Sequence, residues 1–227
     1  KSTRAGFTTY HTTYGQGPLS ALKIHCSLAH SGSWGRMARG LSGLLTMTAF
    51  DMPGHGRSAA WDDRGEIQKV TADIAADFPD GPWDIIGHSF GATVALRLAV
   101  LPERGDRCSA ARAVTQLRGD GTSWENMPQP VQTTLAGQMH LIAAARAALH
   151  DDVGGMLAPG ILDRVYMPVL LVEGSQSPDI IHRINDGLSA RLPSVTRAII
   201  MGAAHMAPLT HADQVSEEVL RFLRKTL

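Results

Sequence analysis

The chain has few of the features that mark disulfide-rich, nucleic-acid-binding or membrane-spanning proteins. Its two cysteines, Cys26 and Cys108, are too few for a disulfide framework, and no C-x-x-C pair is present. Basic and acidic residues number 21 each, without a basic cluster, so nucleic acid and membrane surfaces are not expected partners. The sequence also lacks an apolar run long enough for a membrane span and a signal-peptide pattern at its start. We therefore expect a cytoplasmic protein.

Internal repeats and low-complexity segments are absent as well. The length of 227 residues fits one domain, and 44% hydrophobic and 19% charged residues are ordinary values for a globular protein. We expect a monomer or homodimer. The chain begins at Lys1 without Met, so we expect either a trimmed sequence or one from which residues have been omitted.

Segments typical of strands alternate with segments typical of helices. We expect strands over 7–14, 21–26, 45–51, 83–86, 113–117, 167–172 and 196–201, and helices over 66–78, 92–99, 180–192 and 212–226. This alternation predicts an α/β fold with a doubly wound, mostly parallel sheet. Functional groups are then expected at the carboxyl ends of the strands.

Residues 87–91 read G-H-S-F-G and lie between a predicted strand and a helix-forming segment rich in small residues. A G-x-S-x-G motif at such a junction predicts a nucleophile elbow, in which a serine sits on a tight turn above the sheet. Gly87 and Gly91 are needed because side chains there would collide with the crossing strand and helix. In the alternative interpretation, Ser89 only caps the helix.

Three further segments accompany the elbow in a fixed order. Residues 25–34 open with His and close on Trp, with Cys26 where a glycine is usual; residues 51–58 read D-M-P-G-H-G-R-S; and residues 202–206 read G-A-A-H-M. Together with the elbow, these segments resemble the α/β-hydrolase fold superfamily over nearly the whole chain. The resemblance implies the α/β-hydrolase fold and serine-hydrolase chemistry.

The resemblance also implies the roles of the site residues. Ser89 is the expected nucleophile, and His205 is the expected base, because a serine hydroxyl is weak until its proton is removed. The backbone N–H groups of Ser27 and Phe90 are the expected oxyanion donors. In the alternative interpretation, His205 is a surface-loop histidine.

The acidic member of the triad is less well defined. Family members commonly place an aspartate three residues after the glycine that ends a late strand, but here Gly174 is followed at that distance by Ser177. Asp179 is the favoured acid. The alternatives are Ser177, Asp120 after the predicted strand over 113–117, and a residue missing from the sequence near 108–112.

The segment over 109–160 is expected to form a helical lid on a core of residues 1–108 and 161–227. The side chains predicted to line the substrate pocket are His25, Leu28, Trp124 and Met206. Met127, Met139 and Met156 are further candidates within the lid, with ordinary packing against the core as the alternative.

The sequence thus predicts a serine hydrolase that cleaves a small, partly apolar ester, lactone, thioester or C–C bond. Its ten histidines include no H-x-x-x-H spacing, so neither a metal ion nor a cofactor is expected. A cofactor-free haloperoxidase or lyase would use the same residues. A catalytically silent, receptor-like protein is the alternative outside enzymes.

Overall fold

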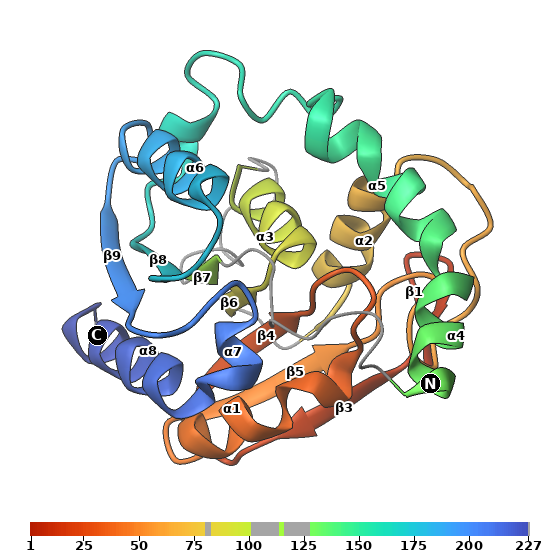
Figure 1. Cartoon of the computed structure of the whole chain (residues 1–227), viewed down its shortest axis with the longest axis horizontal. Helices are drawn as coiled ribbons and strands as arrows, with labels where there is room; N and C mark the ends of the chain where they lie inside the picture. Colours follow the sequence, from red (N-terminus) through yellow and green to blue (C-terminus); the bar gives the residue numbers. More distant parts are fainter. Residues whose placement is uncertain (80–82, 101–113, 116–127, 227) are drawn as a thin grey trace.

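A seven-stranded sheet forms the centre of the molecule in the computed structural model (Figure 1). The structure describes residues 1–79, 83–100, 114–115 and 128–226. The strands lie in the order β3-β5-β4-β6-β7-β8-β9, and all run parallel except the edge strand β3. They comprise β3 His11–Tyr14, β4 Leu19–Ile24, β5 Leu45–Phe50, β6 Asp84–Gly87, β7 Val114–Thr115, β8 Val169–Gly174 and β9 Val195–Ile200, beside a separate hairpin of β1 Ser2–Arg4 and β2 Phe7–Thr9. The predicted α/β class with a mostly parallel sheet is confirmed.

Helices cover both faces of the sheet (Figure 1). Helices α1 and α8 pack together on one face, whereas α2 and α3 pack together on the other. The helices are α1 Gly35–Leu41, α2 Ile67–Ala76, α3 Phe90–Val100, α4 Gln129–Gly137, α5 Met139–His150, α6 Asp179–Ser189, α7 Ala207–Thr210 and α8 Ala212–Thr226, with short 3-10 helices η1 Ser31–Trp34 and η4 Leu162–Arg164. Among the residues that the structure describes, no helix is long and apolar enough to cross a membrane.

The continuously apolar sequence of strand β8 is explained by its burial on both faces of the sheet. Val169 and Leu171 are buried in the core under α2 and α3, whereas Leu170 and Val172 are buried in the core under α1 and α8. Successive side chains of a strand point to opposite faces. A central strand covered on both sides therefore needs apolar residues at every position.

The short strand predicted over 113–117 is present as β7. It pairs with both β6 and β8 and so belongs to the central sheet. The predicted lid boundary at residue 109 is therefore wrong, because β7 lies inside the range assigned to the lid. The rest of 109–127 lies outside the described residues.

Helix α5 lies in the predicted lid yet packs directly on the core. Its residues Leu141 and Ala145 are each 2% exposed and join the hydrophobic core on the α2 and α3 side. Leu141 also covers Gly54, where a Cβ would lie 2.5 Å from the leucine side chain. This part of the lid region is therefore fixed to the turn that follows β5.

Candidate active site

Ser89 lies on the tight turn between β6 and α3, and its backbone is in the left-handed region, with a φ of 54°. Such a conformation costs a non-glycine residue about 1–3 kcal/mol. A Cβ at Gly87 would lie 2.6 Å from the Cα of Ala92, and a Cβ at Gly91 would lie 2.2 Å from the oxygen of Ile24. The predicted need for both glycines is confirmed. A residue that only caps a helix has extended backbone, so the geometry favours the elbow over the cap.

His205 lies in the loop after β9 and is fully buried, so the interpretation as a surface-loop histidine is wrong. The Nε2 of His88 lies 3.2 Å from the backbone oxygen of His205, and the two ring centroids are 5.5 Å apart. Because His88 directly precedes Ser89, this contact joins the turn of Ser89 to the loop that carries the predicted base. Burial lowers the pKa of His88 to about 4. Its ring is therefore neutral near pH 7, and Nε2–H donates to the carbonyl.

The predicted oxyanion donors lie at the start of α3 and in the loop after β4. Phe90 is the first residue of α3, and N–H groups in a first helical turn have no carbonyl partner within their own helix. Ser27 lies in the loop after β4, within a turn closed by the Ala29 N–H, which donates to the Cys26 oxygen at 3.2 Å. The N–H of His88 donates to the last residue of β4 at 3.0 Å, which holds the elbow against this loop. The turn forms with cysteine in place of the usual glycine.

His25 links two loops through both nitrogens of its ring. Its Nδ1 lies 2.7 Å from the oxygen of Cys26, and its Nε2 lies 3.0 Å from the backbone nitrogen of Met52. Nε2 therefore accepts and Nδ1 donates, which requires a neutral ring. Burial lowers the pKa of His25 to about 3, in agreement with this tautomer. Both nitrogens are thus engaged within the protein, which gives His25 a structural role, and its predicted place in the substrate pocket stays a prediction.

Asp51 fixes the glycine-rich turn over 51–58 to the loop after β4. Its carboxylate accepts hydrogen bonds from the N–H groups of Ser31 and Arg57, at 2.5 and 2.7 Å. Gly56 has a φ of 53°, and a Cβ there would lie 2.1 Å from this carboxylate. Burial acts to raise the pKa of Asp51, but these N–H donors outweigh it and lower the pKa below its ordinary value. Asp51 therefore stays charged near pH 7 and holds both loops.

Residues 24–218 match the model of the Alpha/beta hydrolase family. The chain belongs to this family. Curated relatives include a lipase of Mycobacterium tuberculosis, 38% identical over 86 residues that cover 37% of this chain and 32% of the lipase. They also include a pimeloyl-[acyl-carrier protein] methyl ester esterase of Neisseria meningitidis, 25% identical over 206 residues that cover 74% of this chain and 64% of the esterase. The chain thus spans less than two thirds of the length of either relative.

Solved structures also show the alpha/beta hydrolase fold. A serine hydrolase involved in carbazole degradation superposes with a TM-score of 0.78 at 18% identity, and the match covers 98% of this chain and 96% of that one. At this identity the similarity establishes the fold alone. The four sequence segments that resembled the superfamily are therefore placed in the expected scaffold.

In this alpha/beta hydrolase, the loop after β8 contacts the loop that carries His205. The N–H of Gln176 donates to the oxygen of Ala203 at 2.8 Å, and the adjacent Ser177 is buried. Asp179, the favoured acid, is the first residue of α6 and is exposed. An exposed carboxylate is solvated and weakly held, so its position does not favour the predicted role.

The buried carboxylate at the end of β8 has a different function. Glu173 accepts hydrogen bonds from Asn185 of α6 at 2.8 Å and from Arg197 of β9 at 2.6 Å. These contacts use both carboxylate oxygens to attach α6 to the sheet edge. Asp120 and the segment near 108–112, where the sequence also allows the acid to lie, are outside the described residues.

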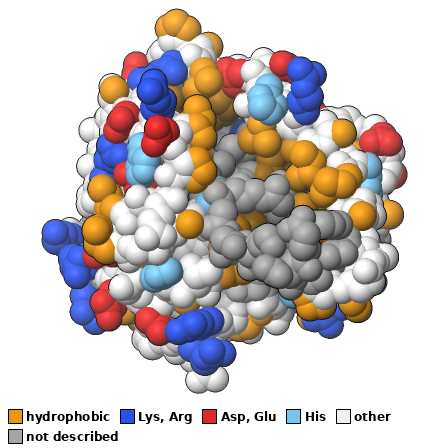
Figure 2. Space-filling model, viewed as in Figure 1, with side chains coloured by type: hydrophobic (Ala, Val, Ile, Leu, Met, Phe, Trp, Pro, Cys, Tyr) orange, Lys and Arg blue, Asp and Glu red, His pale blue; other side chains and the backbone are white. Residues whose placement is uncertain are grey.

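A cavity of about 230 Å³ opens beside Ser89 between α3, α5 and α6. Its apolar wall is formed by Leu96, Leu149, Met156, Leu157, Ile184 and Leu188. Its polar lining is formed by Gln68, Thr93, His150 and Asp152. Figure 2 shows hydrophobic side chains gathered on this face of the molecule, around the region of α5 and α6. The cavity can therefore take an apolar group bound next to Ser89.

The lining of this cavity differs from the prediction. Met156, one of the further candidates within the lid, is part of the wall. Leu28 and Met206 belong to the loops after β4 and β9, and they do not line the cavity between the three helices. Met139 is 47% exposed at the far end of α5. Trp124 and Met127 lie outside the described residues.

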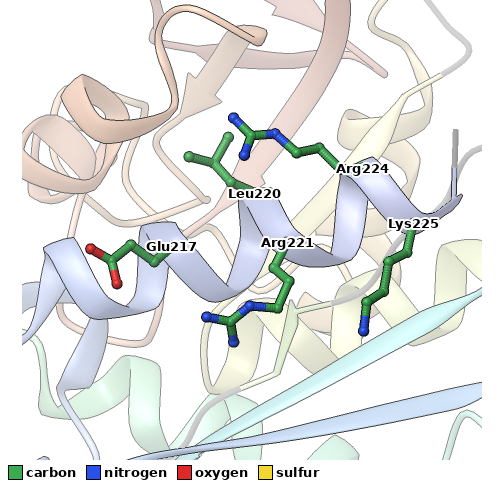
Figure 3. A pocket seen from close by; sticks show the side chains of 5 residues that line it. All are labelled: Glu217, Leu220, Arg221, Arg224 and Lys225. Carbon is green, nitrogen blue, oxygen red and sulfur yellow. The ribbon is translucent and has the colours of Figure 1, made fainter.

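A larger hollow of about 410 Å³ lies along α8 (Figure 3). It is lined by Glu217, Leu220, Arg221, Arg224 and Lys225, all from one helix. Figure 3 shows Arg224 and Leu220 on one side of the helix and Arg221 and Lys225 on the other, so the cations diverge. Neither Ser89 nor His205 lines this hollow. Within the described ranges, no group of three or more His, Cys, Asp or Glu side chains is placed to hold a metal ion.

Proposed function

We propose that this chain is a serine hydrolase that cleaves a small, partly apolar ester, lactone or thioester through an acyl-enzyme on Ser89. The carrying observation is the strained backbone of Ser89 at the edge of an apolar cavity, next to the loop of the buried His205. A C–C bond beside a ketone is a further substrate class for the same chemistry, since its carbonyl carbon is attacked in the same way.

In the proposed mechanism, His205 takes the proton of the Ser89 hydroxyl as the oxygen attacks the substrate carbonyl carbon. The carbonyl oxygen becomes negatively charged and accepts hydrogen bonds from the N–H groups of Phe90 and Ser27. Losing one such donor typically costs about 3–4 kcal/mol of transition-state stabilisation. The intermediate collapses, and His205 gives its proton to the leaving oxygen or sulfur. Water, activated by His205, then cleaves the acyl-enzyme and restores Ser89.

The lining of the cavity supports an acyl group as the part of the substrate held beside Ser89. Its wall is mainly apolar, and water displaced from such a surface favours the binding of hydrocarbon. The curated relatives are named a lipase and a methyl ester esterase, and both names refer to ester cleavage. Esters are therefore the first substrates to test.

For the acid that orients His205, we propose Asp120 over Asp179. Asp120 follows β7, whose carboxyl end lies at the same edge of the parallel sheet as the ends of β6 and β9. Asp179, in contrast, is exposed. Ser177 cannot offset the charge of an imidazolium as a carboxylate does. A residue missing near 108–112 is the remaining alternative.

Hydrolysis of p-nitrophenyl butyrate tests the proposal. We expect wild-type turnover that falls by a factor of at least about 10⁴ in Ser89→Ala and in His205→Ala. Asp120→Asn is expected to lower kcat by about 10³–10⁴, and Asp179→Asn by less than tenfold. Each variant is first compared with the wild type by circular dichroism.

The assay also separates the competing interpretations. Turnover that persists in Ser89→Ala would exclude the nucleophile. A wild-type protein that binds the ester analogue p-nitrophenyl butyramide but hydrolyses no ester would favour the receptor-like alternative. Equal losses in Asp120→Asn and Asp179→Asn would contradict the proposed acid.

A further inference from the structure

Gln68 is a buried polar residue in the wall of the cavity beside Ser89, and the proposed reaction makes no use of it. It lies at the start of α2 and is 3% exposed. Its side-chain Oε1 lies 2.8 Å from Nη1 of Arg97. A guanidinium carries donors only, so the atom that faces it must be the amide oxygen. The amide nitrogen of Gln68 is therefore at the other end of the group.

The two N–H donors of this nitrogen face the cavity. Within the part of the chain that the structure describes, Gln68 Nε2 makes no hydrogen bond. This nitrogen is not completely buried either, so a ligand can reach it. Gln68 is only 3% exposed, and it is one of the residues that line the cavity. The donors are thus directed to whatever occupies that space.

The other polar side chains of the lining are already engaged or exposed. The hydroxyl of Thr93 donates to the oxygen of Phe90 at 2.8 Å. The carboxylate of Asp152 accepts two N–H groups of its own loop, at 2.9 and 2.8 Å. His150 is exposed at the end of α5. The amide of Gln68 is therefore the buried donor that this lining offers to a ligand.

Two helices hold the amide in a fixed orientation. Nη1 of Arg97, on α3, also contacts Oε2 of Glu66 at 2.6 Å. The carboxylate of Glu66 in turn caps α2 by accepting from the N–H groups of Gln68 and Lys69. The loop after α5 closes over this cluster, since a Cβ at Gly154 would lie 3.1 Å from Arg97 and 3.3 Å from Gln68. The donor is therefore pre-organised before a ligand binds.

The position of Arg97 gives the distance from the nucleophile. Arg97 is seven residues after Phe90, which is about 10 Å along α3. Helical side chains tilt back toward the N-terminus, so the cluster lies somewhat nearer to Ser89. An extended chain advances about 1.2 Å per bond. The donor thus meets an acyl chain about six to eight bonds from the carbonyl carbon.

We propose that Gln68 is a specificity residue that donates a hydrogen bond to an oxygen atom on the acyl chain of the substrate. The substrate class is an ester of a medium-length acyl chain that carries a keto, hydroxyl or ester oxygen. This oxygen lies about six to eight bonds from the cleaved carbonyl carbon, and methylene groups separate the two. The inference rests on the proposed function, since Ser89 defines the position of that carbonyl.

The test compares p-nitrophenyl octanoate with p-nitrophenyl 7-oxooctanoate, two esters of equal length. The measured quantity is the ratio of kcat/KM for the oxo ester to kcat/KM for the plain ester. We expect this ratio to fall about fivefold from wild type to Gln68→Leu, the value of one neutral hydrogen bond. Gln68→Glu, which replaces the donors by acceptors, should lower it at least as much. Gln214→Leu, at an exposed glutamine of α8, is the matched control and should leave the ratio unchanged.

The outcomes separate this inference from the proposed function. If both esters are hydrolysed and the ratio is the same in wild type and Gln68→Leu, Gln68 is only structural and the inference is wrong, while the proposed function stands. If neither ester is hydrolysed, the proposed function fails. The inference is then decided by calorimetric titration with octanoic and 7-oxooctanoic acid. A Kd ratio that changes in Gln68→Leu supports it, and an unchanged ratio overturns it.

Discussion

At the scale of single residues, the elbow is constrained by backbone contact more than by side-chain chemistry. Ser89 adopts a strained φ on the tight turn from β6 to α3, which packs against the end of β4. Gly91 packs against the end of β4, where a Cβ would lie 2.2 Å from the backbone oxygen of Ile24 and 2.6 Å from that of His25. Backbone atoms of a central strand cannot move aside as a flexible side chain can. Position 91 must therefore be glycine.

We expect Gly91→Ala to lower the free energy of unfolding by at least about 3 kcal/mol, because the new methyl group overlaps backbone atoms. The matched control is Gly187→Ala in α6, where a Cβ meets nothing within 4 Å. That substitution should raise the free energy of unfolding by about 0.5–1 kcal/mol through helix propensity. Urea unfolding measures both. Equal changes in the two variants would contradict the packing of the elbow.

Ser89 and the need for its flanking glycines could be predicted from the sequence because both follow from a local turn. The structural role of His25 could not, since its ring contacts depend on a turn 27 residues further along the chain. Gln68 was missed for a similar reason. Its orientation is set by Arg97, 29 residues away, and no local pattern records that pairing.

At the scale of helices and strands, burial on both sides of the sheet explains most of what the sequence predicted. The parallel strands read as apolar runs, and the last helix was placed at its observed bounds. Helix α1 was missed because its sequence, G-R-M-A-R-G-L, has two glycines and no capping side chain. Its stability comes from packing against α8, a contact between segments far apart in the chain.

One charged residue interrupts this pattern of burial. Lys23 is on β4, fully buried on the α1 and α8 side, with its Nζ 5.0 Å from the ring centroid of Trp34. Burial lowers the pKa of Lys23 from 10.5 to about 7. In the unfolded chain the amine keeps its proton up to about pH 10. Between pH 7 and 10 the unfolded state therefore binds more protons, and stability rises with pH.

We expect Lys23→Met to raise the free energy of unfolding at pH 7 by roughly 3 kcal/mol, because it removes the cost of burying the amine. The rise in stability between pH 7 and 10 should also become smaller. Lys69→Met, at an exposed lysine of α2 paired with Asp73 at 2.7 Å, is the control and should change stability by less than about 0.5 kcal/mol. Urea unfolding at pH 7 and 9 checks this. If Lys23→Met lowers the free energy of unfolding and leaves its pH dependence unchanged, the expectation is contradicted. The Lys23 amine would then make an interaction that stabilises the fold.

At the scale of the whole molecule, the sheet gathers residues that are distant in sequence. Ser27, Ser89 and His205 follow the carboxyl ends of β4, β6 and β9, which lie at one edge of a parallel sheet. The order of motifs was enough to predict this edge. The cavity could not be predicted, because it is enclosed by α3, α5 and α6, whose mutual packing is set by the fold as a whole.

The central claim is that Ser89 is a nucleophile activated by His205. Labelling with a fluorophosphonate probe, followed by proteolysis and mass spectrometry, tests it most directly, because the probe forms a bond only with an activated hydroxyl. We predict one adduct, on the peptide that carries Ser89, absent in Ser89→Ala and formed at least 100-fold more slowly in His205→Ala. An unlabelled wild-type protein, or an adduct that persists in Ser89→Ala, would contradict the account.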